Sequence, residues 1–159
     1  MIVRDFIPAD AAAFRDLNLA WVEQYFTVEA EDLAQLNDPQ THILDKGGAI
    51  LIAELDGAPV GTVGIVPGHS DSTHALIKMS ARHDVKGRGI GRALMDAAIE
   101  KARLMGASAI WLETNTKLDA ALALYRRTGF RELTGNEITP SPYERCNCQM
   151  LLDLNTLGR

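Results

Sequence analysis

Three glycines within five residues mark the stretch Lys86-Gly-Arg-Gly-Ile-Gly-Arg92. It lies between an apolar segment that ends near Ala81 and a segment, 90–105, in which apolar residues recur at helical spacing. A helix start carries unpaired backbone N–H groups and partial positive charge, and glycines let an anion approach the backbone closely. We therefore predict a strand-to-helix turn that binds an anion, with a diphosphate as the natural ligand.

Spacing excludes two common phosphate-binding motifs. The sequence holds no Gly-x-x-x-x-Gly-Lys-Ser/Thr, and a Gly-x-Gly-x-x-Gly that starts at Gly87 would need glycine where Arg92 stands. ATP and NAD therefore lose support as ligands. A tight turn with solvated basic side chains remains the alternative interpretation of the stretch.

The clearest hairpin precedes this turn. Asp56-Gly57, a dipeptide suited to a tight turn with positive φ, separates the apolar runs 49–55 and 59–66. Residues 67–73 are expected to form a loop. The alternation of strand and helix after residue 75 implies parallel neighbours with a crossover beside the antiparallel hairpin. Further strands are expected at 1–6, 75–81, 109–114 and 147–154, and helical segments at 8–26, 29–44 (interrupted near Pro39), 89–106 and 118–127.

Length and composition describe one globular unit. The chain has 159 residues, of which 47% are hydrophobic, and no repeat or linker divides it, so we predict a single domain over 1–159. No apolar stretch approaches the roughly 18 residues that span a bilayer, and the first residues lack the apolar core of a secretory signal. We expect a cytoplasmic protein without membrane contact. Two cysteines, Cys146 and Cys148, make no disulfide framework.

The charge distribution limits the classes of partner that we expect the chain to bind. The net charge of −5 argues against a nucleic-acid binder, because affinity for the phosphate backbone needs clustered Lys and Arg. Residues 1–80 hold 12 acidic and 4 basic side chains, whereas 81–159 hold 9 and 12, so a small polyanion would prefer the second half and a cation the first. Charge that merely keeps the surface soluble is the alternative. The four histidines lack metal-ligand spacing, and we expect no metal.

Two sequence blocks together resemble the GNAT superfamily of acyl-CoA-dependent N-acyltransferases. The stretch 86–94 is similar to the family's pyrophosphate loop, Arg/Gln-x-x-Gly-x-Gly/Ala, with Lys86 where Arg or Gln is usual. The stretch 121–130, Ala-Leu-Ala-Leu-Tyr-Arg-Arg-Thr-Gly-Phe, is similar to the family's Ala-x-x-Leu-Tyr-x-x-x-Gly-Phe element. The resemblance implies a mixed α/β fold, with a mostly antiparallel sheet, one splayed parallel strand pair and helices on both faces.

The resemblance also implies acetyl-CoA as the donor co-substrate. Backbone groups of Met79 and Ala81, on the strand that would splay from 109–114, are expected to pair with the pantetheine amides. Leu118 stands where many members have an Asn that contacts this arm or the phosphates. Asn115 is the nearest candidate to replace it, and a turn-capping role is its alternative. The residues expected at the pyrophosphate are Lys86, Gly87, Arg88, Gly89, Ile90, Gly91 and Arg92.

Tyr125 matches the family's general acid. A phenol, with an ordinary pKa near 10, is protonated at neutral pH and can pass its proton to a departing thiolate. Tyr125 also ends an i, i+3, i+4, i+7 series that begins at Leu118, so core packing is its alternative role. For the base that deprotonates the acceptor amine, Glu113 and Glu54 are candidates, and either could instead be solvated.

The acceptor site is expected in the segments that are least like the family, 21–31 and 140–145. Trp21, Tyr25 and Tyr143 could form an aromatic wall, and Arg145 could hold a substrate carboxylate by a bidentate pair. A helix stripe and a charged loop are the alternatives for these residues.

The predicted function is transfer of an acetyl group from acetyl-CoA to an amine of a small molecule or peptide. A non-catalytic module that binds or senses acyl-CoA would use the same loop, and the presence of Tyr125 favours the enzyme. A modifier of tRNA or ribosomal protein is a third hypothesis, which the acidic first half disfavours for RNA but not for a basic protein tail. Family members are often dimers, so the resemblance also implies a homodimer.

Overall fold

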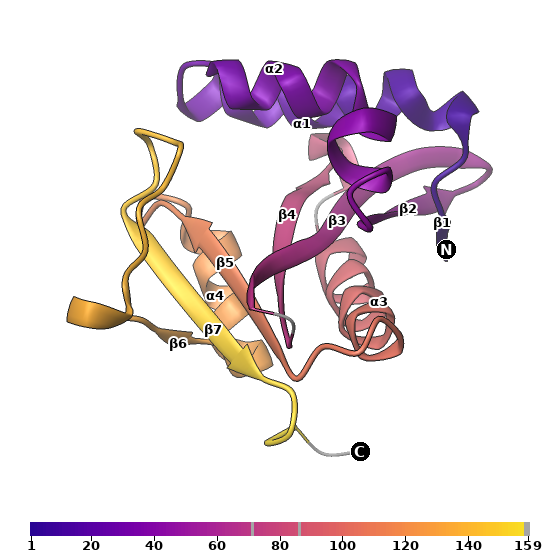
Figure 1. Ribbon diagram of the computed structural model, residues 1–159. Coiled ribbons are helices and arrows are strands. Elements are labelled where there is room, and N and C mark those ends of the chain that lie inside the picture. The colour runs from indigo at the N-terminus through magenta and orange to yellow at the C-terminus, as the bar shows by residue number, and fades with distance from the viewer. Residues whose placement is uncertain (71, 86, 158–159) are drawn as a thin grey trace.

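The computed structural model describes residues 1–70, 72–85 and 87–157, which contain one seven-stranded sheet (Figure 1). Its strand order is β1-β2-β3-β4-β5-β7-β6, and every neighbouring pair is antiparallel except β4 and β5. The mostly antiparallel sheet with one parallel pair, expected from the sequence, is confirmed. The strands are β1 (Ile2–Asp5), β2 (Ala49–Leu55), β3 (Ala58–Ser70), β4 (Thr73–Ala81), β5 (Ala109–Thr114), β6 (Arg131–Glu132) and β7 (Cys148–Asp153).

Helices cover both faces of the sheet. Alternate residues of β2 join different buried clusters, because successive side chains of a strand point to opposite faces: Ile50 and Ile52 pack with Phe14 of α1, whereas Leu51 packs with Leu94 of α3. None of the helices in the described ranges is long and apolar enough to cross a membrane. The helices are α1 (Ala11–Tyr25), α2 (Ala30–Asn37), α3 (Ile90–Leu104) and α4 (Asp119–Thr128), with shorter turns η1 (Pro8–Asp10), η2 (Gln40–Leu44), η3 (His83–Val85) and η4 (Gly135–Glu137).

The expectation of a loop over 67–73 is wrong in part. Strand β3 continues to Ser70, and Pro67 pairs in register with His74 of β4. The pairing of β2 with β3 ends at Ile65, so Pro67 lies where β3 has one neighbouring strand, and proline is tolerated at such an edge position. The β3–β4 hairpin is therefore longer, and its connection shorter, than the Gly, Pro and Ser content indicates.

Gly61 on β3 lets α3 lie close to the sheet. A Cβ at this position would lie 2.9 Å from both Ile90 Cγ2 and Leu94 Cδ1, and 3.1 Å from the Ser80 carbonyl oxygen. Ile90 is the first residue of α3, so the absence of a side chain at Gly61 sets the position of the helix start.

We expect Gly61→Ala to lower the free energy of unfolding by about 1–3 kcal/mol, the usual cost of an extra methyl group in a packed core. The added carbon would push the first turn of α3 away from β3. Equilibrium denaturation in urea measures the change. An unchanged midpoint would show that α3 moves away without cost and that this close approach does not fix its position.

Candidate functional site

A cavity of about 520 Å³ opens where β4 and β5 separate. The parallel pairing of the two strands ends at Ala75 and Trp111, after which they diverge toward α1 and α2 (Figure 1). The second half of β4, the end of β5 and the side of α4 line the cavity, as do the end of α1 and the segment before β7. Residues far apart in the sequence therefore surround one space. Of the residues expected at the site, the cavity brings together Met79, Ala81, Asn115, Tyr125, Trp21, Tyr25, Tyr143 and Arg145.

A bulge in β4 shapes the cavity wall. The register with β3 shifts between Thr62 and Gly64, and Lys78 has a φ of +51°, which is uncommon for a residue with a side chain. The Thr62 hydroxyl donates a hydrogen bond of 2.8 Å to the Lys78 carbonyl oxygen, and Asn18 of α1 donates to Thr62 Oγ1 at 3.0 Å. These buried bonds hold the bulge in place.

The start of α3 packs against α4 at Leu124, and the described residues of the glycine turn lie outside the lining of this cavity. A Cβ on Gly91, in the first turn of α3, would lie 3.4 Å from Leu124 Cδ2, and Leu124 precedes Tyr125 on α4. Gly87 and Gly89 have φ of +83° and +77°, and Gly89 caps the helix in the left-handed conformation. These positions require glycine for the conformation of the backbone, since an added Cβ would meet nothing within 4 Å.

The open space in front of these glycines suits an anion. The first backbone hydrogen bond into the start of α3 runs from Ala93 to the Gly89 carbonyl, and within the described residues the amides of 87–92 donate no backbone hydrogen bond, as is usual at a helix start. Arg88 and Arg92 are exposed beside them, and Arg92 Nε lies 3.9 Å from Asp96 in a weak surface pair. Lys86, which the sequence places at the same turn, lies outside the described residues.

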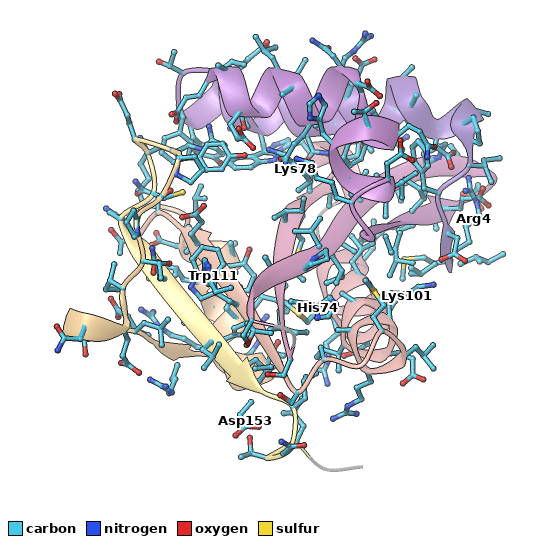
Figure 2. The ribbon with its side chains drawn as sticks, in the orientation of Figure 1. Arg4, His74, Lys78, Lys101, Trp111 and Asp153 are labelled. Atoms are coloured by element: carbon cyan, nitrogen blue, oxygen red, sulfur yellow. The ribbon has the colours of Figure 1, made fainter. Side chains whose placement is uncertain are left out.

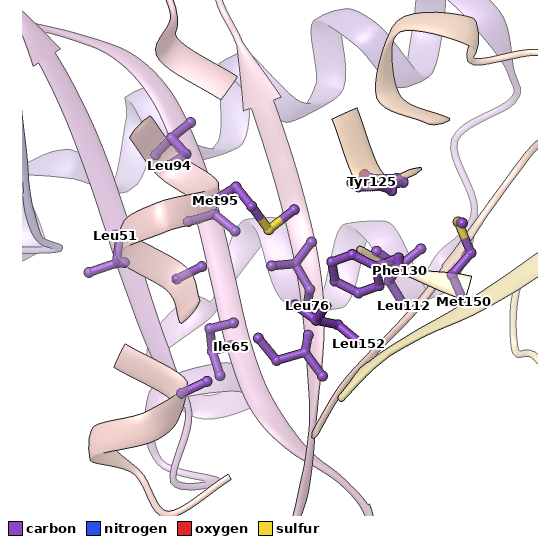
Figure 3. Close-up of a cluster of buried hydrophobic side chains, with 14 of the residues drawn as sticks. Leu51, Ile65, Leu76, Leu94, Met95, Leu112, Tyr125, Phe130, Met150 and Leu152 are labelled. Atoms are coloured by element: carbon purple, nitrogen blue, oxygen red, sulfur yellow. The ribbon is translucent and has the colours of Figure 1, made fainter. Parts of the chain in front are cut away.

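Tyr125 both packs in the core and borders the cavity. Its side chain is 8% exposed, and its ring centroid lies 5.8 Å from that of Phe130 (Figure 3). Burial raises the pKa of the Tyr125 phenol to about 12. The hydroxyl therefore stays protonated at neutral pH, as a proton donor requires.

The expected aromatic residues lie together at the α1 end of the cavity. Trp21, Tyr25 and also Phe26 come from the end of α1, and Tyr143 comes from the segment between η4 and β7. The Trp21 and Phe26 rings meet edge to face at 6.2 Å. Phe26 lies within the segment 21–31 that was expected at the site, although it was not named among the aromatic residues of the wall.

The guanidinium group of Arg145 is hydrogen-bonded within the protein. Its two terminal nitrogens each donate to an Asp32 oxygen at 2.6 Å, and one of them also lies 3.4 Å from Glu29. The guanidinium lies 4.5 Å from the centroid of Tyr143. A substrate carboxylate, the expected partner, would have to displace Asp32.

Asp32 is the centre of a buried ionic cluster that the sequence did not indicate. It is fully buried and also accepts a hydrogen bond from Lys78 Nζ at 3.1 Å. Lys78 Nζ donates in turn to the Tyr143 hydroxyl at 3.2 Å. Burial alone would raise the pKa of Asp32, but hydrogen bonds from Arg145 and the Glu29 amide, with the charge of Lys78, hold it at about 2. Burial lowers the pKa of Lys78, against the pull of Asp32.

Of the two candidate bases, only Glu113 lines the cavity. Burial raises the pKa of its carboxyl group, and Oε2 is buried with no hydrogen-bond partner in the described part of the chain. Glu54 instead pairs with Arg4 at 2.6 Å, between β1 and β2. Trp111, two residues before Glu113, faces the same side of β5 and also lines the cavity.

Asn115 uses both of its polar groups within the protein. Its Nδ2 donates to the Arg145 carbonyl oxygen at 2.7 Å, and its Oδ1 accepts from the Lys117 amide at 2.9 Å. These bonds tie the end of β5 to the segment before β7, which agrees with the turn-capping alternative. Both cysteines are free, and the described residues hold no group of three or more potential metal ligands.

The geometry agrees with what comparison with known proteins shows. Residues 12–130 match the family described as the Acetyltransferase (GNAT) family. The chain belongs to this family. Both the resemblance seen in the sequence and the fold it implied are thereby confirmed.

Relatives of this GNAT chain are named as N-acetyltransferases. It is 35% identical over 107 residues to "Probable N-acetyltransferase camello" of Xenopus tropicalis, covering 67% of this chain and 48% of the relative. It is 29% identical to "N-acetylaspartate synthetase" of Rattus norvegicus, covering 86% of this chain and 46% of the relative. "Uncharacterized N-acetyltransferase YjgM" of Escherichia coli is 30% identical, with 79% of this chain and 77% of the relative covered. The chain thus spans about half the length of the first two of these relatives.

Solved structures share the whole fold. The acetyltransferase of the GNAT family from Staphylococcus aureus has a TM-score of 0.86 at 21% identity, with 96% of this chain and 98% of that chain covered. An aminoglycoside 6'-N-acetyltransferase complexed with coenzyme A has a TM-score of 0.72 at 15% identity, with 100% and 99% covered. At this identity the likeness concerns the fold alone.

Proposed function

We propose that this chain transfers an acetyl group from acetyl-CoA to the amine of a small molecule or peptide. One observation carries the proposal: a single cavity runs through the gap between β4 and β5 and is bordered by a protonated phenol and the half-buried carboxyl group of Glu113. The glycine turn at the head of α3 suits a diphosphate. The names of the relatives, and the coenzyme A bound to a neighbour of the same fold, support this assignment.

The residues present fit the donor. The amides at the start of α3, with Arg88 and Arg92, would hold its pyrophosphate. The unpaired edge of β4 beyond Ala75, which includes Met79, would hold its pantetheine arm by backbone hydrogen bonds. Acetyl-CoA, when bound, supplies an activated acyl carbon and a thiolate leaving group.

In this proposal Glu113 accepts a proton and Tyr125 donates one. The reaction forms a bond between the amine nitrogen and the acyl carbon and breaks the bond from that carbon to sulfur. Glu113 accepts the proton that the amine loses, since burial raises the pKa of this carboxyl group above its ordinary value. Tyr125 donates its phenolic proton to the sulfur. The active site then returns to its starting state when a proton passes from Glu113 to Tyr125 through solvent.

We expect Gly89→Val to weaken acetyl-CoA binding at least tenfold, measured by calorimetry. A β-branched residue is strained at a φ of +77°, so the turn would rearrange and its amides would no longer converge. Gly57→Val is the matched control, because Gly57 has a φ of +78°, open space around it and a place in the β2–β3 turn. The control should lose stability similarly and bind acetyl-CoA as the wild type does.

A thiol-release assay with acetyl-CoA and a panel of amines tests the transfer itself. Thiol release that depends on an amine supports the proposed function. Binding of acetyl-CoA without thiol release on any amine would support the module that only binds or senses acyl-CoA. Absence of acetyl-CoA binding would overturn both.

A further inference from the structure

The ionisable side chains that line the cavity differ in whether they have partners. Lys78 and Arg145 are both paired with Asp32, which is fully buried. Glu113 has no such ion pair: its Oε2 is buried without a hydrogen-bond partner in the described ranges, although Ser141 and the more distant charges of Arg145 and Lys78 act on its carboxyl group. A buried carboxylate that lacks a partner is unfavourable, and an ammonium group placed against it would restore the missing interaction. Glu113 Oε2 can therefore accept a hydrogen bond from the ammonium group of a ligand in the cavity.

The surroundings of Glu113 are aromatic. Trp111 lies on the same face of β5, and Trp21, Phe26 and Tyr143 complete the lining at the α1 end of the cavity. In Figure 2, Trp111 lies on the β5 side of the gap and Lys78 lies below α1 and α2. The indole N–H groups of Trp21 and Trp111 have no hydrogen-bond partner within the described chain, and they add polarity without charge. Such a wall binds the flat or apolar body of a ligand.

A carboxylate on the acceptor would find little support in this cavity. Both terminal nitrogens of Arg145 are held at 2.6 Å by Asp32, so a ligand would have to break a buried ion pair. Lys117 lies over the Phe26 ring at 4.5 Å, but it is exposed, and an exposed ion pair contributes only about 0–1 kcal/mol. In an α-amino acid the carboxylate is two bonds from the nitrogen. It would therefore lie next to Glu113 and repel it.

We infer that the acceptor is a primary amine on an aromatic or apolar body without a carboxylate, bound with its nitrogen against Glu113. This inference rests on the proposed function and adds the class of substrate. It separates the chain from an enzyme that acetylates a dicarboxylic amino acid, although several relatives are named N-acetylaspartate synthetase.

Three acceptors test the inference on the wild-type protein: 2-phenylethylamine, L-phenylalanine and L-aspartate. The first two differ only by a carboxylate. We expect kcat/KM for 2-phenylethylamine, from thiol release with acetyl-CoA, to exceed that for each amino acid at least tenfold. If L-phenylalanine or L-aspartate is acetylated as efficiently as the amine, the inference is overturned while the proposed transfer stands.

A binding measurement gives a second readout that needs no turnover. Calorimetry of 2-phenylethylamine with the protein saturated in coenzyme A should show at least tenfold weaker binding for Glu113→Gln than for the wild type. Glu100→Gln is the matched control, since Glu100 is exposed on α3, and it should bind as the wild type does.

The two readouts separate the failure of the inference from the failure of the proposed function. Glu113-dependent binding of 2-phenylethylamine without thiol release would leave the ligand class supported and overturn acetyl transfer. Binding that is no tighter for 2-phenylethylamine than for L-phenylalanine, or that is the same in Glu113→Gln, would overturn the inference.

Discussion

Tyr125→Phe is expected to lower kcat at least a hundredfold and to leave acetyl-CoA affinity within about twofold, because positioned proton donors contribute roughly 10²- to 10⁴-fold to rate. The substitution deletes one hydroxyl group and keeps the ring that packs against Phe130. Burial holds the pKa of this phenol at about 12, so the hydroxyl is protonated in the working enzyme. Thiol release with a good amine acceptor measures kcat, and calorimetry measures the affinity.

The outcome distinguishes the two roles that the sequence left open for Tyr125. A general acid predicts loss of kcat with an intact core, so the unfolding midpoint of Tyr125→Phe should stay close to that of the wild type. A purely structural role predicts an unchanged rate. Unchanged thiol release would therefore show that another group, or water, protonates the sulfur. The other two tyrosines, Tyr25 and Tyr143, also line the cavity, so neither serves as a neutral control.

Local patterns predicted much of the fold. The hairpin around Asp56-Gly57 and the helix after Gly89 are specified by residues that are adjacent or one turn apart, and both are observed. Trp21 and Tyr143 were expected at the acceptor site and lie at the same cavity. The hairpin and the helix depend on turn chemistry and periodicity, which a single sequence carries, whereas Trp21 and Tyr143 were chosen because their segments are least like the family.

Long-range pairing could not be predicted in the same way. Asp32 pairs with Lys78 across 46 residues and with Arg145 across 113 residues. Near the start of α2, Asp32 has the position of an ordinary acidic residue in the first turn of a helix, where solvent exposure is usual. The sequence therefore predicted a substrate carboxylate as the partner of Arg145, whereas Asp32 is its partner in the fold.

The ionic cluster around Asp32 explains part of the charge imbalance between the two halves of the chain. Asp32 and Glu29 belong to the acidic half, and Arg145 belongs to the basic half. Their contacts join α2 to the segment before β7, on the side of the cavity where α1 ends. Part of the charge imbalance therefore forms ion pairs that stabilise the α1 end of the cavity.

Asp32→Asn is expected to lower the free energy of unfolding by about 3–5 kcal/mol, the usual effect of removing one partner from a buried ion pair. The amide keeps the shape of the side chain but loses the charge that both Lys78 and Arg145 require. The side chains of these two residues are 7% and 10% exposed, so water cannot replace the carboxylate. Denaturation in urea at neutral pH measures the difference.

A control variant in an exposed ion pair and a measurement of stability against pH complete this test. Asp16→Asn removes the partner of Arg15 from a pair whose side chains are 66% and 47% exposed, and it should change the free energy of unfolding by no more than about 1 kcal/mol. The pKa of Asp32 is lowered from 3.8 to about 2, so its contribution is present above pH 3.8 and is lost as the pH falls toward 2. Wild type and Asp32→Asn should therefore converge in stability in that range. Equal stability at neutral pH would instead mean that Lys78 releases its proton and Glu29 alone balances Arg145.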